Sequence, residues 1–230
     1  MSSDPWRGGL PWTAGFLLFP IVATTLAAKS YETWAAWLPM KVPVYIVVWL
    51  GYTVACWIAV YGVWLWSSRR GTADKIFVFR RPTGRDWGIA LGGAAVGILI
   101  LYPLSQWLAQ VLFGAQMRGM SFDIRQPFVL PVVLVWAVLT APVAEEVLFR
   151  GLAVAYLQAR HWPAWAVGAT TCLAFAAYHL PYFGIAGATL ILFWGGMVVA
   201  IRLWRGNLTP GWILHIINNV VAYIAIPLLR

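Results

Sequence analysis

Charged side chains are scarce in this chain: Asp, Glu, Lys and Arg make up 10% of its 230 residues, while hydrophobic residues make up 62%. A water-soluble domain of this length needs a charged surface, so the composition excludes an ordinary soluble protein. The mean hydropathy of +0.77 instead predicts a polytopic helical membrane protein, whose spans each need about 20 apolar residues.

Several sequence features are absent, and each absence narrows the choice of function. The chain has two cysteines, Cys56 and Cys172, in separate apolar runs, so no disulfide framework is expected. It has no H-E-x-x-H motif, whose paired histidines on one helical turn would make zinc the default ligand. We find no internal repeat, no low-complexity tract and no linker, so we expect one integrated membrane domain.

The net charge is +9 and the chain has 16 tryptophans. An excess of cations could indicate a nucleic-acid partner, but here the cations lie in short loops between apolar runs. Such loops are typical of the cytoplasmic side of a membrane protein, and tryptophans near the ends of apolar runs are typical of the membrane interface. We therefore expect the lipid bilayer, and no nucleic acid, as a partner.

The apolar runs predict an all-α transmembrane bundle of about seven helices. The first run resembles a signal peptide in length but lacks a strongly basic start and a small-residue cleavage site, so it is interpreted as a spanning helix. We expect residues 1–127 to hold three helices and a basic cytoplasmic loop, and residues 128–230 to hold a catalytic core. The predicted spans are about 10–28, 42–66, 87–113, 128–157, 163–179, 185–203 and 210–228.

The distribution of cations predicts the orientation. If the N-terminus is cytoplasmic, ten loop cations lie on the cytoplasmic side and five on the outer side, and this excess favours that orientation. We therefore expect a multi-pass protein of the cell inner membrane, with its N-terminus in the cytoplasm and its C-terminus outside. Arg150 is left out of this comparison because it lies within an apolar run. The inner group is Arg7, Arg69, Arg70, Lys75, Arg80, Arg81, Arg85, Arg160, Arg202 and Arg205, and the outer group is Lys29, Lys41, Arg118, Arg125 and Arg230.

Two adjacent carboxylates, Glu145 and Glu146, stand with Arg150 inside an otherwise apolar run. Ionisable groups at this depth are costly, so they face a bundle interior or a water-filled cavity and mark a functional site. On a helix Glu146 and Arg150 can pair, whereas Glu145 is rotated by about 100° and need not share their environment. We expect a structural pair and a free Glu145 suited to act as general base. The alternative is a pair that only pins two helices.

The histidines supply the remaining polar groups of the apolar runs. His179 ends the fifth predicted helix just before Pro181, and taken alone it would cap exposed carbonyls or lie at the interface. His215 and Asn219 are four residues apart on the seventh helix and present polar groups to one spot. The alternative for that pair is an ordinary interhelical hydrogen bond. His161 lies in a short loop and is expected to be solvated.

Three motifs of this sequence, built on the Glu145–Glu146 pair, on His179 and on His215 in chain order, resemble those of the CPBP family of intramembrane proteases. That family includes the eukaryotic CAAX prenyl endopeptidases, the bacteriocin-processing and immunity "Abi" proteins, and bacterial proteases that process C-terminal sorting signals. The resemblance covers roughly residues 129–228, and the first three predicted helices carry no motif. The motifs are E-E-x-x-x-R at Glu145, Glu146 and Arg150, F-x-x-x-H at Phe175 and His179, and H-x-x-x-N at His215 and Asn219.

The resemblance implies a glutamic-type hydrolase without a cofactor. In such an enzyme Glu145 and His179 would activate a water, and His215 and Asn219 would donate hydrogen bonds to the oxyanion, while Glu146, Arg150 and Phe175 would support the site. Amide hydrolysis needs a base for water and donors where negative charge develops. The rival mechanism is a zinc protease, in which Glu145, His179 and His215 ligate the metal and leave a position for water.

Two non-protease functions remain as alternatives: a catalytically silent scaffold or immunity protein, and a transporter with a proton relay. The transporter would require inverted repeats, and the first half has no intramembrane carboxylate to mirror Glu145. For the protease, we expect a membrane-anchored peptide or protein substrate: a prenylated C-terminus, a leader or bacteriocin precursor, or the C-terminal anchor of a sorted protein. By analogy with bacterial relatives, precursor or sorting-signal processing is favoured.

Helix geometry constrains the shared site. Glu145 and His179 each lie roughly 25 Å from the turn near His161, whereas His215 lies roughly 13 Å from the turn near Gly206, at 1.5 Å per residue. For these groups to meet, either the hairpin around Arg160 projects into the cytoplasm, or one helix is displaced or broken. We predict the projecting hairpin, with the site in the cytoplasmic half of the bilayer.

Overall fold

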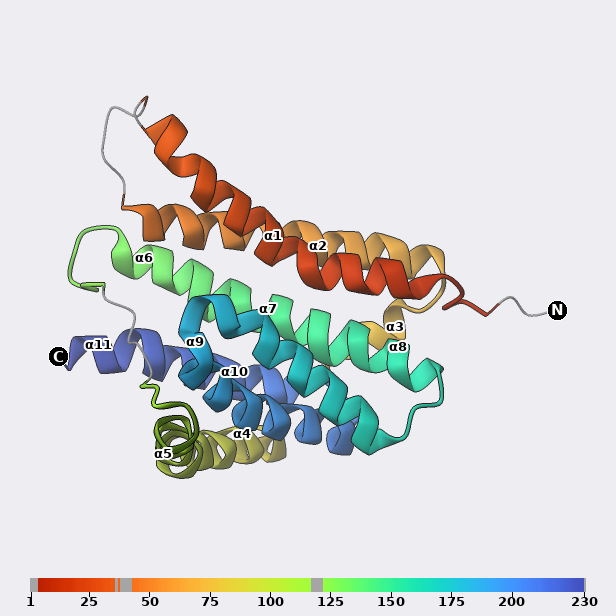
Figure 1. Ribbon diagram of the computed structural model, residues 1–230. Helices are drawn as coiled ribbons and strands as arrows, with labels where there is room; N and C mark the ends of the chain where they lie inside the picture. The colour runs from red at the N-terminus through yellow and green to blue at the C-terminus, as the bar shows by residue number, and fades with distance from the viewer. Residues whose placement is uncertain (1–3, 36, 38–42, 117–121, 230) are drawn as a thin grey trace.

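The computed structural model describes residues 4–35, 37, 43–116 and 122–229. Every regular element within these residues is helical, which confirms the predicted all-α fold (Figure 1). Three of the cations used to predict the orientation, Lys41, Arg118 and Arg230, lie outside the described residues.

Six helices in the described part of the chain are long and apolar enough to cross a membrane. The first two are α1 (Gly9–Ala35) and α2 (Val44–Arg69), and a short α3 (Ala73–Ile76) follows them. The third contains α4 (Gly84–Val96), η1 (Gly97–Leu101) and α5 (Tyr102–Phe113). The fourth contains α6 (Val129–Val133), η2 (Leu134–Thr140), α7 (Ala141–Glu145), η3 (Glu146–Ala153) and α8 (Val154–Ala159). The last two are α9 (Ala164–Arg205) and the run of α10 (Thr209–Val220), η4 (Val221–Ala225) and α11 (Ile226–Leu228).

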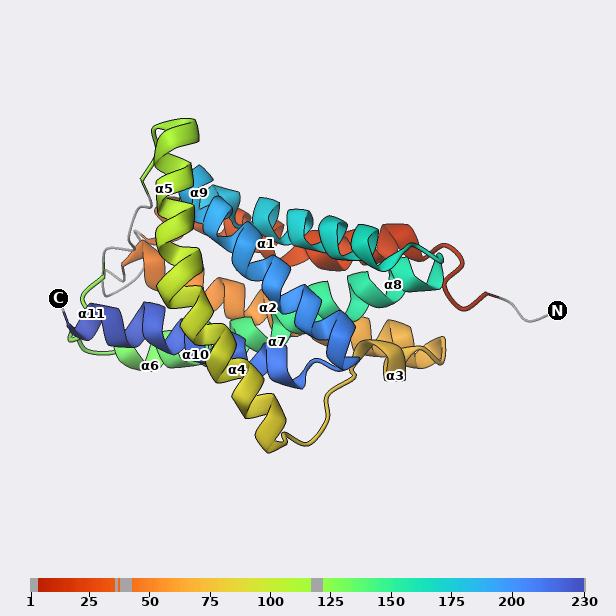
Figure 2. The same ribbon diagram turned by 90° about the horizontal axis from the view of Figure 1, so that it is seen from below.

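Helix α9 reverses direction within its length. Gly184 has φ 64° and ψ −173°, a conformation open essentially only to glycine, and the chain turns back there (Figures 1 and 2). The Cys172 thiol contacts the Leu192 carbonyl oxygen at 2.8 Å, so the two halves run side by side. They correspond to the fifth and sixth predicted spans, so counting the two halves separately gives seven long helical segments in the described part of the chain.

The predicted end of the fifth helix at His179 is wrong. The helix continues through Pro181 to the reversal at Gly184. The prediction relied on Pro181 as a helix breaker, since proline lacks a backbone N–H and its ring crowds the preceding turn. In this helix Pro181 stands in the last turn, so the disruption falls where the helix is about to end.

The segments η1, η2 and η4 have π-helical hydrogen bonding, and each lies just before a proline: Pro103, Pro142 and Pro227. A proline leaves the carbonyl four residues earlier without its α-helical partner, and in each case that carbonyl belongs to the π-helical segment. The segment η3 contains no proline. It carries Glu146 and Arg150, and π-helical turns recur at functional sites.

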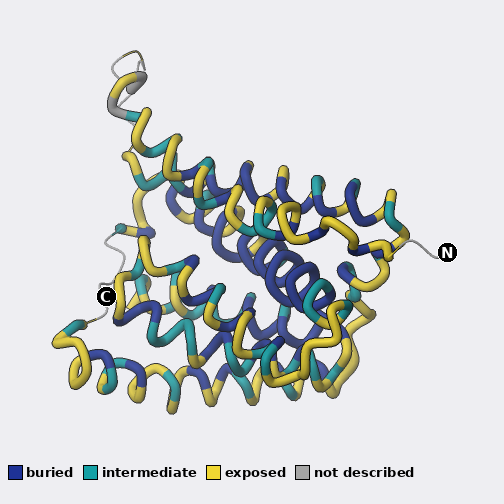
Figure 3. Tube along the Cα trace, turned by 45° about the vertical axis from the view of Figure 1, so that its right-hand side comes forward, coloured by how far each residue is buried: buried dark blue, intermediate teal, exposed yellow. Residues whose placement is uncertain are grey.

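The fourth span is the central helix of the bundle. In the most hydrophobic stretch of each span, 72% of the residues are buried there, against 17–39% in the other five, and Figure 3 shows it enclosed by the other helices. Helices α1 and α2 cover one side, while α9 and α10 cover the other, with α4 and α5 crossing outside them (Figures 1 and 2). The charged side chains of the central helix, Glu145, Glu146 and Arg150, are all buried and are therefore held away from lipid.

Candidate active site

Three separate helices bring Glu145, His179 and His215 together. Glu145 ends α7, His179 lies in the first half of α9, and His215 lies in α10. The Glu145 Oε2 atom is 3.7 Å from His179 Nε2 and 3.6 Å from His215 Nε2. The expected shared location is therefore confirmed, although the catalytic roles of these residues remain a hypothesis.

The depth argument also agrees with the arrangement of the turns. In Figures 1 and 2 the turn between α8 and α9 lies nearer the N-terminal end of the bundle than the turn between α9 and α10. This offset allows a residue well along α9 to meet one near the start of α10. The position of the site relative to the bilayer stays a prediction.

Glu146 contacts the opposite edge of the same imidazole. Its Oε1 atom is 3.1 Å from His215 Nδ1 and 3.5 Å from the Arg150 NH1 atom. On a helix the two carboxylates need not share an environment, but here they do, because the His215 ring lies between them and faces each with one nitrogen. Both residues keep helical backbone angles, with φ −68° at Glu145 and −65° at Glu146, so the ring between the carboxylates, and not a change in helical rotation, brings them into one site.

Arg150 is fully buried and connects the central helix to α9. Besides its pair with Glu146, it lies over the Phe175 ring at 3.9 Å and donates from NH2 to the Gly195 carbonyl at 3.4 Å. Arg202 donates in turn from Nε to the Arg150 carbonyl at 3.1 Å. These contacts join Arg150 and Phe175 to each other and to Glu146, and their supporting role stays a prediction.

The hydrogen bonds of the histidines indicate their orientation. His179 Nδ1 is 2.8 Å from the Phe175 carbonyl, which only accepts, so Nδ1 carries the proton. The Nε2 atom of a neutral His179 is then an acceptor directed toward Glu145. His215 has the same orientation, with Nδ1 donating to the Glu146 carboxylate. The Trp194 and Phe175 rings pack against His215 at 4.7 and 6.4 Å between centroids.

Asn219 lies one turn beyond His215 but is not joined to the carboxylate. Its Nδ2 atom donates to the Ala137 carbonyl at 2.7 Å, and its Oδ1 atom accepts from Asn218 at 3.3 Å. Among the contacts of the described residues, none joins Asn219 to Glu145, His179 or His215. An oxyanion contact would therefore use the second hydrogen of the Asn219 amide.

Tyr52, from α2, was missed by the sequence analysis. Its hydroxyl donates to Glu145 Oε1 at 2.7 Å, and the Tyr178 hydroxyl lies 3.1 Å from that of Tyr52. The only signal in the sequence is a tyrosine inside an apolar run. Tyr45 and Tyr61 belong to the same helix, so that signal does not single out Tyr52.

The site is closed on most sides. Glu145 and His215 are each 4% exposed, and the His179 side chain is the more accessible at 12%. No group of three or more His, Cys, Asp or Glu side chains among the described residues is arranged to hold a metal ion. His161 lies apart from the site, in the turn between α8 and α9, with φ 60°.

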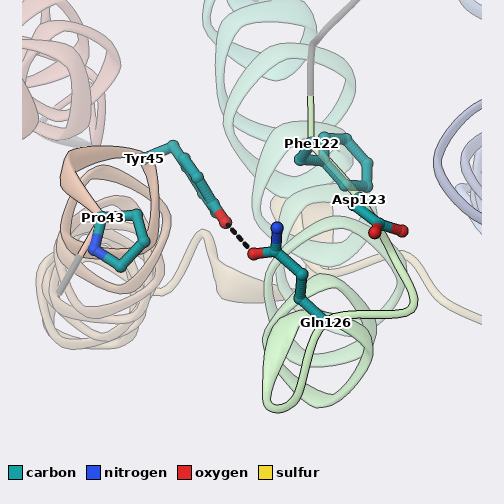
Figure 4. A pocket seen from close by; sticks show the side chains of 5 residues that line it. All are labelled: Pro43, Tyr45, Phe122, Asp123 and Gln126. Atoms are coloured by element: carbon teal, nitrogen blue, oxygen red, sulfur yellow. Dashed lines mark hydrogen bonds between the residues drawn. The ribbon is translucent and has the colours of Figure 1, made fainter.

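A separate cavity of about 520 Å³ lies where α2 and α6 begin. Its lining includes Tyr45 and Gln126, whose side chains meet at 3.4 Å (Figure 4). Asp123 is the only carboxylate in its lining. None of the motif residues lines this cavity, so it is not part of the site around Glu145.

Comparison with known proteins gives one match. No curated protein and no solved structure matches the chain. Residues 127–221 match the family model described as type II CAAX prenyl endopeptidase Rce1-like. The match includes both carboxylates, Arg150, His179, His215 and Asn219, and leaves out α1 to α5. Over residues 127–221 the chain is therefore similar to Rce1-like CAAX proteases, which agrees with the resemblance of its three motifs.

Proposed function

We propose that this protein is an intramembrane endopeptidase of the glutamic type, which hydrolyses a peptide bond of a membrane-tethered precursor or C-terminal sorting signal. The observation that supports this most is the convergence of Glu145 with the Nε2 atoms of two histidines, 3.6–3.7 Å away, inside the central helix of an apolar bundle. The Rce1-like match supports an endopeptidase. The distances around Glu145 are compatible with one water bound beside the carboxylate and the histidines.

In this mechanism a water lies between Glu145 Oε2 and His179 Nε2. Both atoms accept hydrogen bonds, so they bind the two hydrogens of the water and direct its oxygen lone pair outward. As the water oxygen attacks the peptide carbonyl carbon, its proton passes to Glu145. The C–N bond then breaks and the proton is transferred to the departing amine nitrogen, which balances the hydrolysis.

The negative charge that develops on the carbonyl oxygen needs donors. His215 and Asn219 are assigned this role, with His215 donating from Nε2 when both ring nitrogens carry protons. Glu146 accepts the hydrogen bond from Nδ1 at 3.1 Å and so fixes the ring. Removing one such donor from a preorganised site typically lowers kcat by about 100- to 1,000-fold.

A zinc-dependent protease is the second candidate, and one observation favours it. Both histidines direct Nε2 to the same carboxylate oxygen and bind an oxygen with Nδ1, as zinc-binding histidines usually do. Since no group of three or more His, Cys, Asp or Glu side chains among the described residues is arranged to hold a metal ion, zinc binding would require these side chains to move. In that mechanism Glu145, His179 and His215 would be the ligands, and zinc would supply a Lewis acid that activates water. The two mechanisms differ in their response to a chelator.

The test compares new peptide termini in membranes carrying the wild-type chain, Glu145→Gln or Asp74→Asn at equal expression. Glu145→Gln keeps the side-chain volume but removes the base, while Asp74 is an exposed carboxylate of α3 and serves as control. We expect termini that are present with wild type and Asp74→Asn and absent with Glu145→Gln. These termini would also identify the substrate and the bond.

Identical termini in all three membranes, with a candidate substrate present, would contradict the protease and leave a catalytically silent scaffold or immunity protein. Repeating the experiment after treatment with a zinc chelator decides the mechanism. Retained cleavage is expected for the glutamic type, and cleavage that is lost and then restored by added zinc would establish the metal-dependent type.

A further inference from the structure

The two oxygens of the Glu145 carboxylate have different surroundings. Oε2 faces the Nε2 atoms of both histidines, whereas Oε1 accepts a hydrogen bond from the Tyr52 hydroxyl at 2.7 Å. A carboxylate can rotate about its last side-chain bond unless both oxygens are engaged. In this site the contact at Oε1 determines where Oε2 points.

Tyr52 is itself oriented by Tyr178. A tyrosine hydroxyl has one hydrogen to donate, and Tyr52 gives it to the carboxylate, so it accepts from the Tyr178 hydroxyl at 3.1 Å. The hydrogen bonds thus run in one direction, from Tyr178 to Tyr52 to Glu145. Both tyrosines are buried, at 7% and 6% exposed, so water does not compete for these contacts.

Aromatic packing fixes the Tyr178 ring. Phe149 contacts it edge-on at 5.3 Å between centroids, and the His179 ring also lies 5.3 Å away. Tyr178 therefore lies next to His179 in both sequence and space. A displacement of the tyrosine pair would move Glu145 relative to the histidine that shares the water.

We propose that Tyr52 is a positioning residue for Glu145, and that Tyr178 acts through Tyr52. This inference rests on the proposed function and extends it. The positioning group comes from α2, outside residues 127–221 that match the family model, so the helices before the match complete the site. Misplacement of a reacting group by about 1 Å lowers rates by up to about 100-fold.

The first test measures kcat and KM of the full-length protein in liposomes, with a peptide spanning the bond found by the terminus comparison. Tyr52→Phe is expected to lower kcat by about 10- to 100-fold and to leave KM within about twofold, because it removes only a hydroxyl that orients the base. Tyr178→Phe is expected to lower kcat less. Tyr61→Phe, on the same helix but 60% exposed, is expected to match wild type.

A double variant makes the test sharper. If Tyr178 acts through Tyr52, the double variant has the same kcat as Tyr52→Phe alone. If the two residues act independently, the two reductions in kcat multiply. Wild-type kcat for Tyr52→Phe, a change confined to KM, or multiplied effects in the double variant would each overturn the proposal. If Tyr52→Phe does not fold, the kcat of Tyr178→Phe decides in its place, and a wild-type value overturns the proposal.

A second measurement does not depend on activity. The infrared carboxyl band that Glu145→Gln removes from the wild-type spectrum reports the hydrogen bonding of Glu145. We expect Tyr52→Phe to shift this band and Tyr61→Phe to leave it in place. An unshifted band overturns the proposal, while a shifted band in a protein without protease activity would contradict the proposed function and keep the hydrogen-bonded pair.

Discussion

At the scale of single residues, Arg150 determines the charge balance of the buried site. It is 1% exposed, and its ion pair with Glu146 is equally enclosed. A buried pair of this kind gains little over apolar residues of the same volume, but breaking it leaves one uncompensated charge. Glu146 also orients His215, so a loss at Arg150 affects both stability and the site.

Arg150→Met is expected to lower the free energy of unfolding by about 3–5 kcal/mol, because it strands the Glu146 charge in the bundle. Thermal unfolding in detergent measures this change. Arg160→Met removes an exposed pair with Asp4 and a hydrogen bond to the Trp6 carbonyl, and it is expected to cost about 1–2 kcal/mol. The double variant Arg150→Met/Glu146→Gln should recover most of the loss, and equal losses for all three would contradict the explanation.

The polar residues of the site differ in how far the sequence predicts them. Glu145, His179 and His215 stand out because charged or imidazole groups are rare in apolar runs. Such groups avoid lipid by facing the interior of the helical bundle, where they can meet. Tyr52 does not stand out, since tyrosine is ordinary in membrane helices and only the packing of α2 against the central helix directs its hydroxyl to Glu145. The Asn219 amide is likewise placed by the carbonyl of Ala137, on another helix.

At the scale of elements, the apolar runs predicted every crossing because span length is set by the thickness of the bilayer. The reversal at Gly184 could not be predicted with the same accuracy. The chain has 21 glycines, and a positive φ at one of them depends on how the two halves of α9 pack. The π-helical turn at Glu146 could not be predicted either, since η3 contains no proline that would indicate it.

Gly151 in η3 allows a close approach between the central helix and α3. A Cβ atom at this position would lie 2.6 Å from the Ile76 carbonyl oxygen, whereas one at Gly92 would meet nothing within 4 Å. Gly151→Ala is therefore expected to destabilise the fold by about 1–3 kcal/mol and to lower cleavage, because Arg150 is its neighbour. Gly92→Ala should leave both unchanged.

Thermal unfolding and cleavage rate, measured on both glycine variants, check this expectation. A Gly151→Ala protein with wild-type stability would mean that α3 shifts away without cost. In that case the close approach does not contribute to holding η3 in place.

At the scale of the whole molecule, the two ends of the described chain lie at opposite ends of the bundle (Figure 1), as expected for seven successive long segments when α9 is counted as two. The loop from 67 to 86 carries most of the cations near the N-terminal end, which supports an N-terminus inside the cell. We expect a tag at the N-terminus to be protected from an impermeant reagent in intact cells and a tag at the C-terminus to react. A reactive N-terminal tag with a protected C-terminal tag would mean that the orientation is reversed. If both tags react, or both are protected, the two ends lie on the same side of the membrane, which would contradict the reversal in α9.

The placement of Tyr52 has a consequence for the order in which the protein is made. Residues are synthesised from the N-terminus, so Tyr52 is in the membrane before Glu145, and His179 and His215 follow later. The central helix brings its own partner for Glu146, in Arg150, but none for Glu145. Tyr52 is thus the first group able to receive the Glu145 carboxylate as that helix leaves the translocon. The histidines then join a carboxylate that α2 already holds.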